Sequence, residues 1–269
     1  MNVKHFIIAI LILSLLLTMM IGCKTTRDEN QTFYEGDYLL GVQENECYII
    51  RYNGKDENIT LPTITKDGRK IIGIGSWAFS ETETLKVVDI PVGYVFIDSS
   101  AFYKCSNLGS IKISKTVSVL SEYDVFAQCN SLSNFVVDEN NKKFQSKGQC
   151  ILTKDGERLI YGCKDSVIPE GTKTIGKNAF CEIESLTTIT IPQSVTVIEE
   201  FAFFGCLSLK NVVLHSDITS VGLYAFVNCP ELTVSCDFAA CPGGWDEKWC
   251  TSSADKKYPE PQVDWIGQP

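Results

Sequence analysis

The sequence predicts an α/β solenoid, in which each coil of about 23 residues holds one short parallel strand and one helical or 3-10 turn. Two observations lead to this fold class. A small residue followed by Phe recurs six times, with the aromatic residue at Phe79, Phe102, Phe126, Phe180, Phe203 and Phe226. Successive Phe residues are separated by 23, 24, 54, 23 and 23 positions. A fixed period in this range is typical of stacked coils that each bury one layer of core.

Leu, Cys and aliphatic residues recur at fixed distances from the anchor Phe. Six residues after each Phe comes a Leu: Leu85, Leu108, Leu132, Leu186, Leu209 and Leu232. In four copies the third residue after Phe is Cys: Cys105, Cys129, Cys206 and Cys229. Five residues before Phe stands an aliphatic side chain in five copies: Ile74, Ile97, Ile175, Ile198 and Val221. In the third copy this residue is Leu120, one position further out. We expect all of these side chains to point into one shared core.

Each copy also contains a strand signal. Leu108, Ile111 and Ile113 end in an alternation of period two, which is typical of a strand with one buried face. A Pro often follows, at Pro91, Pro169 and Pro192, and ends the strand because it has no amide donor. The residues around Ala-Phe are expected to form a single helical turn. Six such coils would stack with their strands about 4.8 Å apart.

The repeated pattern I-P-x-x-V-x-x-I-x-x-x-A-F-x-x-C-x-x-L, over about residues 45–236, resembles the BspA-like leucine-rich repeat family of bacterial and protist surface proteins. The resemblance implies a leucine-rich-repeat solenoid and a role at the cell surface, often adhesion to proteins. It implies no active site, because the residues that the family shares are core residues.

The N-terminal residues predict export and lipid attachment. Lys4 precedes an apolar run that ends near Gly22, so residues 1–22 are predicted to be a signal peptide. The sequence M-I-G-C before and at Cys23 resembles a bacterial lipobox, which makes Cys23 the lipid-bearing residue and residues 23–35 a tether. We therefore expect a lipid-anchored protein of the bacterial cell envelope, on an outer membrane and facing the exterior. The alternative is an uncleaved anchor, although the run is short for a membrane span.

The solenoid is predicted to cover residues 36–236. Residues 36–70 form an N-terminal cap, with two strands joined by a turn at Asn53-Gly54. Residues 138–167 form an insert between the third and fourth anchors, with a hairpin turn at Asp155-Gly156. The insert is either a binding element or a decoration that only extends the sheet.

Residues 237–269 are predicted to form a C-terminal cap and a loose tail. Trp245 and Trp249 are four residues apart and would share one side of a helical turn. They either cover the last core layer or form an aromatic platform for a sugar. We expect the tail after residue 250 to be loose, because it contains three Pro residues.

The cysteine and histidine residues give little support for catalysis or metal binding. The four repeat cysteines are expected to be buried free thiols. Cys236, Cys241 and Cys250 are candidates for a disulfide in an exported protein, and weaker candidates for zinc ligands since no C-x-x-C pair is present. After the signal peptide one His remains, His215, which is expected on the surface at a strand end. No nucleophile or phosphate-binding motif is present. We predict no metal site, no cofactor and no enzyme activity.

The outward face of the strands is the remaining candidate for a functional surface. These positions alternate with the inward ones, and we call them the binding row: Val87, Asp89, Ser110, Lys112, Asn134, Val136, Thr188, Thr190, Asn211 and Val213. The row predicts a non-catalytic adhesion module for a protein or glycan partner, centred on its last four members. A net charge of −9 argues against nucleic acid. The alternatives are a plain solvated sheet, an envelope enzyme or a structural envelope component.

Overall fold

The computed structural model describes residues 31–251 and 258–266. All of the strands described below lie in the unit Thr32–Pro269. The predicted signal peptide and Cys23 lie outside the described residues. No helix in the described part of the chain is long and apolar enough to cross a membrane.

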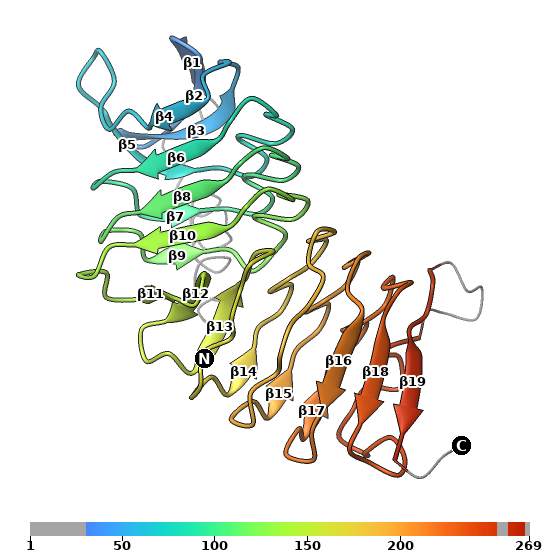
Figure 1. The fold of residues 1–269 in the computed structure, drawn as a ribbon. Helices are drawn as coiled ribbons and strands as arrows, with labels where there is room; N and C mark the ends of the chain where they lie inside the picture. The colour runs from blue at the N-terminus through green and yellow to red at the C-terminus, as the bar shows by residue number, and fades with distance from the viewer. Residues whose placement is uncertain (1–30, 252–257, 267–269) are drawn as a thin grey trace, which may run out of the picture. The chain divides into compact units, whose positions relative to one another are not determined.

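The described residues form short strands throughout. Their bounds are β1 (Thr32–Glu35), β2 (Tyr38–Gln43), β3 (Glu46–Tyr52), β4 (Asn58–Thr60), β5 (Lys70–Ile74), β6 (Val87–Ile90), β7 (Phe96–Ile97), β8 (Ser110–Ile113), β9 (Val119–Leu120), β10 (Asn134–Val137), β11 (Phe144–Lys147), β12 (Cys150–Thr153), β13 (Arg158–Tyr161), β14 (Thr174–Ile175), β15 (Val197–Ile198), β16 (Asn211–Leu214), β17 (Ser220–Val221), β18 (Thr233–Cys236) and β19 (Gln262–Trp265). The coils stack in chain order (Figure 1).

Each coil contributes to two walls. One wall consists of the row sheets, β4-β6-β8-β10 and β16-β18-β19, whose strands all pair in parallel. The other wall consists of the return sheets, β1-β2-β3-β5-β7-β9 and β11-β12-β13-β14-β15-β17. The cap strands predicted around Asn53-Gly54 exist as β3 and β4, but they belong to different walls and do not form a hairpin.

The core between the walls confirms the repeat phase. All six anchor Phe side chains are at most 1% exposed. Their rings stack from coil to coil, with centroids 5.1 Å apart for Phe79 and Phe102 and 4.9 Å apart for Phe180 and Phe203. Each of the four repeat cysteines donates its thiol proton to the carbonyl oxygen of the Phe one coil earlier, at 3.0–3.2 Å. Burial raises the pKa of Cys105 and of Cys229 to about 12, so they remain neutral thiols.

The prediction of an α/β fold with a helical turn in each coil is wrong. The described residues contain no helix, and the chain is a β-solenoid of about eight turns. Two residues of each Ala-Phe turn have positive φ, two positions before and two positions after the Phe: Trp77 and Glu81, Ser100 and Lys104, Asp124 and Gln128, Asn178 and Glu182, Phe201 and Gly205, Tyr224 and Asn228. Left-handed residues interrupt a right-handed helix. Alternate amides of the turn bond to the next coil instead, as Phe79 N does to Ala101 O at 2.8 Å.

The insert is a partition inside the solenoid, and not a decoration at its edge. Both β12 and β13 are buried on both faces. One side of the hairpin, with Ile151 and Tyr161, belongs to the hydrophobic core that begins at Leu40. The other side, with Leu152 and Leu159, belongs to a second core that ends at Cys250. The hairpin therefore divides the solenoid interior into two separate cores.

The insert repeats the topology of the N-terminal cap. In each return sheet three antiparallel strands (β1-β2-β3 or β11-β12-β13) precede three parallel ones. The turns Thr65–Arg69 and Thr153–Glu157 share the sequence T-K-D-G, and in both the Thr hydroxyl bonds to the Asp carboxylate. The insert thus caps the second core as the N-terminal strands cap the first.

At the C-terminal end, Trp245 and Trp249 are buried and cover the last core layer, with Trp249 edge-on to Phe226 at 5.9 Å. Their burial rules out the sugar platform. The prediction of a loose tail is wrong for residues 262–265, which form β19 in parallel with β18 and place Trp265 6.3 Å from Trp245. All eleven described cysteines are free thiols, including the three candidates for a disulfide near this end.

Candidate binding surface

The first six residues of the binding row lie on one sheet. Val87, Ser110 and Asn134 pair in register across β6, β8 and β10, and so do Asp89, Lys112 and Val136. The strand residues between them, Val88, Ile111 and Phe135, are buried in the core. Because each outward side chain is flanked by buried ones, its position is fixed by the core.

The structure does not join all ten row residues into one sheet. Thr188 and Thr190 lie in an extended segment that is not assigned to a strand, and Asn211 and Val213 lie on β16 in the other row sheet. Sequence reasoning missed several outward positions that continue the row: Asn58 and Thr60 on β4, Thr233 and Ser235 on β18, Gln262 and Asp264 on β19. The alternating apolar and polar residues in T-V-S-C and in V-D-W could have predicted strands β18 and β19.

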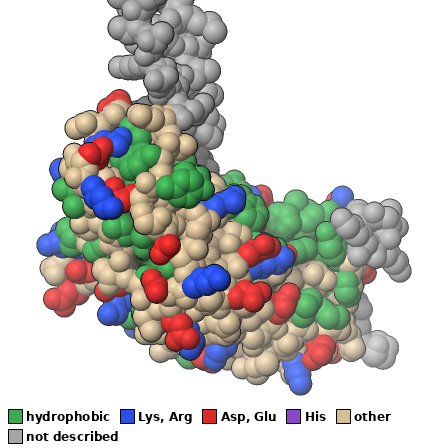
Figure 2. Space-filling model, turned by 90° about the horizontal axis from the view of Figure 1, so that it is seen from above, with side chains coloured by type: hydrophobic (Ala, Val, Ile, Leu, Met, Phe, Trp, Pro, Cys, Tyr) green, Lys and Arg blue, Asp and Glu red, His purple; other side chains and the backbone are tan. Residues whose placement is uncertain are grey.

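The row is nearly neutral. Its two charged members neutralise each other, with Lys112 Nζ 3.7 Å from Asp89 Oδ2. Among its apolar members, Val213 is 53% exposed and Val136 is 40% exposed. On the face drawn in Figure 2, acidic and basic side chains are interspersed. Such a surface suits a protein or an uncharged polymer better than a polyanion.

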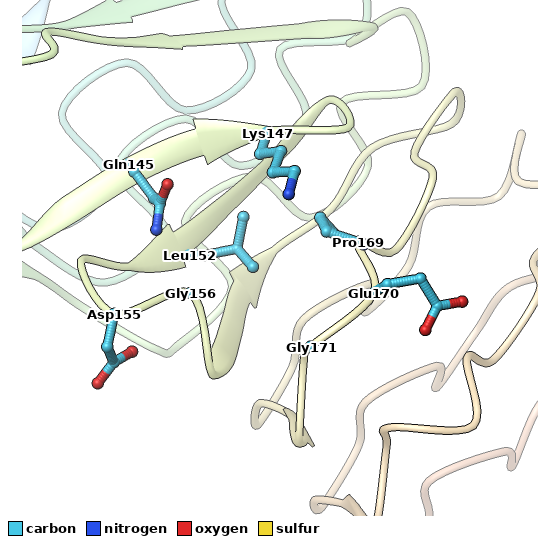
Figure 3. Close-up of a pocket in the computed structure, with 8 residues that line it drawn as sticks. All are labelled: Gln145, Lys147, Leu152, Asp155, Gly156, Pro169, Glu170 and Gly171. Atoms are coloured by element: carbon cyan, nitrogen blue, oxygen red, sulfur yellow. The ribbon is translucent and has the colours of Figure 1, made fainter.

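A shallow hollow lies beside the insert hairpin (Figure 3). It measures about 140 Å³ and lies between the hairpin turn at Asp155-Gly156 and the turn Pro169–Gly171. Small-molecule sites usually measure about 300–1,000 Å³. The carboxylates of Asp155 and Glu170 point away from the hollow (Figure 3). Hydrogen bonds from Thr153 and from the Glu157 amide lower the pKa of Asp155. The Asp155 carboxylate therefore stabilises the hairpin turn. The hollow is too small for a typical small-molecule site.

An ion-pair network joins the coils on either side of the insert. Arg158, on β13, places Nη2 3.1 Å from Glu122 Oε2 and 2.7 Å from Glu199 Oε2. Glu199 also accepts the backbone amide of Lys177 at 3.0 Å. The geometry is that of a bidentate guanidinium–carboxylate pair. Glu122 follows β9, Arg158 lies on β13 and Glu199 follows β15, so the network links the coils before and after the insert and extends past the coil of β14.

The predicted surface position of His215 is wrong, because its side chain is buried and the residue is only 3% exposed. Its Nε2 donates to the carbonyl oxygen of Pro192 at 2.9 Å. Ser114 makes the equivalent bond to Pro91 at 2.8 Å. His215 therefore links neighbouring coils. In the described part of the chain, no group of three His, Cys, Asp or Glu residues is placed to hold a metal ion.

Comparison with known proteins agrees with this architecture. The family model described as "BspA type Leucine rich repeat region" matches residues 51–148 and 160–237 in six copies. A leucine-rich repeat protein from Eubacterium ventriosum is 17% identical, with a TM-score of 0.48 over 77% of this chain and 72% of its own. A leucine-rich repeat protein from T. pallidum is 22% identical, with a TM-score of 0.43 over 79% and 81%.

A leucine-rich cell surface protein from Faecalibacterium prausnitzii is 16% identical, with a TM-score of 0.41 over 90% of this chain and 96% of its own. A search among curated proteins gave no match. The repeat phase, the buried Phe and Leu ladders and the family model over most of the solenoid agree with one another. The chain belongs to the BspA-type leucine-rich repeat family.

Proposed function

We propose that this protein is a non-catalytic binding module on the bacterial cell surface, held there by a lipid on Cys23 after removal of residues 1–22. It binds a protein partner, with a glycan as the second candidate, through the binding row, centred on Thr188, Thr190, Asn211 and Val213. Proteins of the BspA-type family are often found at the cell surface, and leucine-rich repeat families are generally non-enzymatic.

The observation that carries this proposal is the alternation of exposed and fully buried side chains along the row strands. On β16, exposed Asn211 and Val213 alternate with Val212 and Leu214, which are at most 1% exposed. A face held this rigidly loses little conformational entropy when a partner binds. The continuous strand pairing and the neutral charge of the row suit a large partner. The net charge of −9 makes nucleic acid an unfavourable one.

The test begins with a binding screen of the full-length protein in detergent, against matrix proteins and glycans. For the ligand that is found, Thr188→Arg and Asn211→Arg should each weaken binding at least tenfold, because a long cation is placed in the contact. The melting temperature should remain unchanged, since both side chains are exposed. Gln193→Arg, an exposed change on the neighbouring turn, is the control and should bind normally.

The hairpin turn is the competing surface. If both row variants bind normally and Lys154→Glu abolishes binding, then the hairpin turn is the site and the row is not. If the protein cleaves a matrix protein or a glycan of the screen, the non-catalytic proposal fails as well.

The lipid anchor has its own test. The wild-type protein should partition into the detergent phase, because each buried acyl CH₂ contributes about 0.8 kcal/mol and two or more chains give stable attachment. Cys23→Ser should leave the protein unacylated and its signal peptide uncleaved. Mass spectrometry of the wild-type N-terminus would contradict the anchor if the mature chain began at any residue other than Cys23.

A further inference from the structure

Six aromatic residues, two of them exposed and four half-buried, gather on a surface that the binding row does not include. We call it the Ala-Phe edge: the turn of each coil that spans from three residues before the anchor Phe to two residues after it. On this edge, beside the buried anchors, lie Trp77, Tyr103, Tyr123, Phe201, Phe204 and Tyr224. The ten row positions hold no aromatic residue. Aromatic side chains are enriched at the energetic centres of protein interfaces.

Trp77 is the unusual member of this group. Its φ is +63°, a left-handed conformation that is a genuine outlier for a bulky residue. The equivalent positions in the next three coils hold Ser100, Asp124 and Asn178, and Asn and Asp enter this region most readily. Trp77 is nevertheless 55% exposed, with one edge contact to Tyr103 at 5.2 Å. The turn imposes this left-handed conformation in all six coils, and at Trp77 burial of the ring does not offset its cost.

The other strained aromatic residues differ from Trp77. Phe201 and Tyr224 also have positive φ, at +58° and +55°. Their rings pack edge-on against each other at 5.5 Å, and Phe201 packs on Phe204 at 5.8 Å. Both residues are half-buried. In this half of the edge the aromatic contacts compensate the strain.

A segment of this same chain shows what the edge accepts. The tail segment Tyr258–Pro261 has the sequence Y-P-E-P and lies on the edge of the last coils. The carbonyl oxygen of Pro259 accepts the backbone amide of Asn228 at 3.0 Å, and the ring of Tyr258 stands edge-on to Phe204 at 5.4 Å. Proline favours an extended backbone without an amide donor, which suits docking on aromatic surfaces.

We propose that Trp77, Tyr103 and Tyr123 form a docking surface for an extended, proline-containing peptide segment of a partner protein. Tyr123 is 43% exposed, and the backbone bonds Trp77 N to Ser99 O and Ser100 N to Tyr123 O place these residues on successive coils. Lys104 lies over the Tyr103 ring at 5.4 Å, and Lys177 lies over Tyr123 at 5.3 Å. Each lysine also forms an ion pair with a glutamate of the edge, Lys104 with Glu81 at 3.6 Å and Lys177 with Glu200 at 2.5 Å, so the aromatic rings rather than a net charge carry the contact with the peptide. The proposal is independent of the binding row.

The test uses the full-length Cys23→Ser protein and a labelled synthetic peptide with two tandem copies of Y-P-E-P. The peptide should bind, and Trp77→Asn should weaken binding at least tenfold while raising the melting temperature, because Asn tolerates the left-handed conformation. A purely structural Trp77 predicts the reverse: a lower melting temperature and unchanged binding. Val92→Asn, a comparably exposed change outside both the row and the Ala-Phe edge, is the matched control and should bind as the wild type does.

Three outcomes overturn the proposal. The first is peptide binding that survives Trp77→Asn. The second is binding that is lost in Phe204→Ser but not in Trp77→Asn, which means that the peptide only displaces the tail. The third is failure of the peptide to bind while a neutral polysaccharide binds in a Trp77-dependent manner, which identifies a glycan surface.

A second peptide tests the role of proline. A peptide with Ala in place of every Pro should bind at least tenfold more weakly, and equal binding also counts against the proposal.

Discussion

Tyr161 meets Phe126 edge-on, with ring centroids 5.2 Å apart and ring planes at 90°. Its hydroxyl donates to the carbonyl oxygen of Ser121 at 2.6 Å. The parallel stack of Phe79, Phe102 and Phe126 ends at this perpendicular ring, which the insert supplies. Tyr161 therefore closes the first core, and the solenoid continues beyond it around a second one.

Removing the Tyr161 hydroxyl should destabilise the protein. Tyr161→Phe leaves the Ser121 carbonyl without this donor in a buried site, which costs about 1–2 kcal/mol. The free energy of unfolding, measured with urea, checks this value. Tyr34→Phe is the control, because Tyr34 is mostly exposed and should change stability little. Equal stabilities of the two variants would show that the hydroxyl does not hold the insert in place.

Truncating an anchor Phe should destabilise the protein more than Tyr161→Phe does. Phe203→Ala removes a fully buried ring that stacks on Phe180 at 4.9 Å and on Phe226 at 5.0 Å. We expect a loss of about 3–5 kcal/mol, from the lost burial and the cavity that remains. Phe203→Leu fills most of that volume and should lose clearly less. A near-neutral Phe203→Ala would contradict the assignment of Phe203 to the core.

Replacing Asp124 by Asn should stabilise the protein at neutral pH. Burial raises the pKa of Asp124 above its usual value, although the Cys181 thiol and Lys177 partly oppose this. The folded state then holds the proton more tightly than the unfolded state, so Asp124 reduces stability at pH 7 and less so as pH falls through the raised pKa.

Asp124→Asn should therefore raise the melting temperature at pH 7, and this gain should shrink towards pH 3. Asn also tolerates the φ of +52° at this position. Glu139→Gln, an exposed change, serves as the control for the lost charge. A gain that is the same at both pH values would mean that the carboxylate charge is not its cause.

One thiol should react in the native protein. Of the eleven described cysteines, Cys241 is exposed and the other ten are buried. In a Cys23→Ser background, a thiol reagent such as 5,5′-dithiobis(2-nitrobenzoic acid) should label one fast-reacting group, and Cys241→Ser should abolish that signal. The experiment also decides the bridge suggested by the sequence. If Cys241 is labelled only after reduction, a disulfide with Cys236 or Cys250 exists in the purified protein.

The sequence by itself determined the coil period, the inward Phe and Leu ladders and the outward row. These features could be predicted because each coil repeats the same local pattern, so six copies reinforce one register. The buried lid of Trp245 and Trp249 was one of two alternatives, and their side chains alone could not decide between them.

The tertiary structure decided the remaining features, because they depend on bonds between coils. The Ala-Phe turn forms no helix since every second amide bonds to the next coil, as Phe203 N does to Ala225 O. His215 is drawn into the interior by the Pro192 carbonyl, 23 residues earlier. The insert divides the core because β13 pairs in parallel with β14, and the tail becomes β19 because β18 offers it an unpaired edge. Partners this distant in sequence leave no trace in a local pattern of apolar and polar residues.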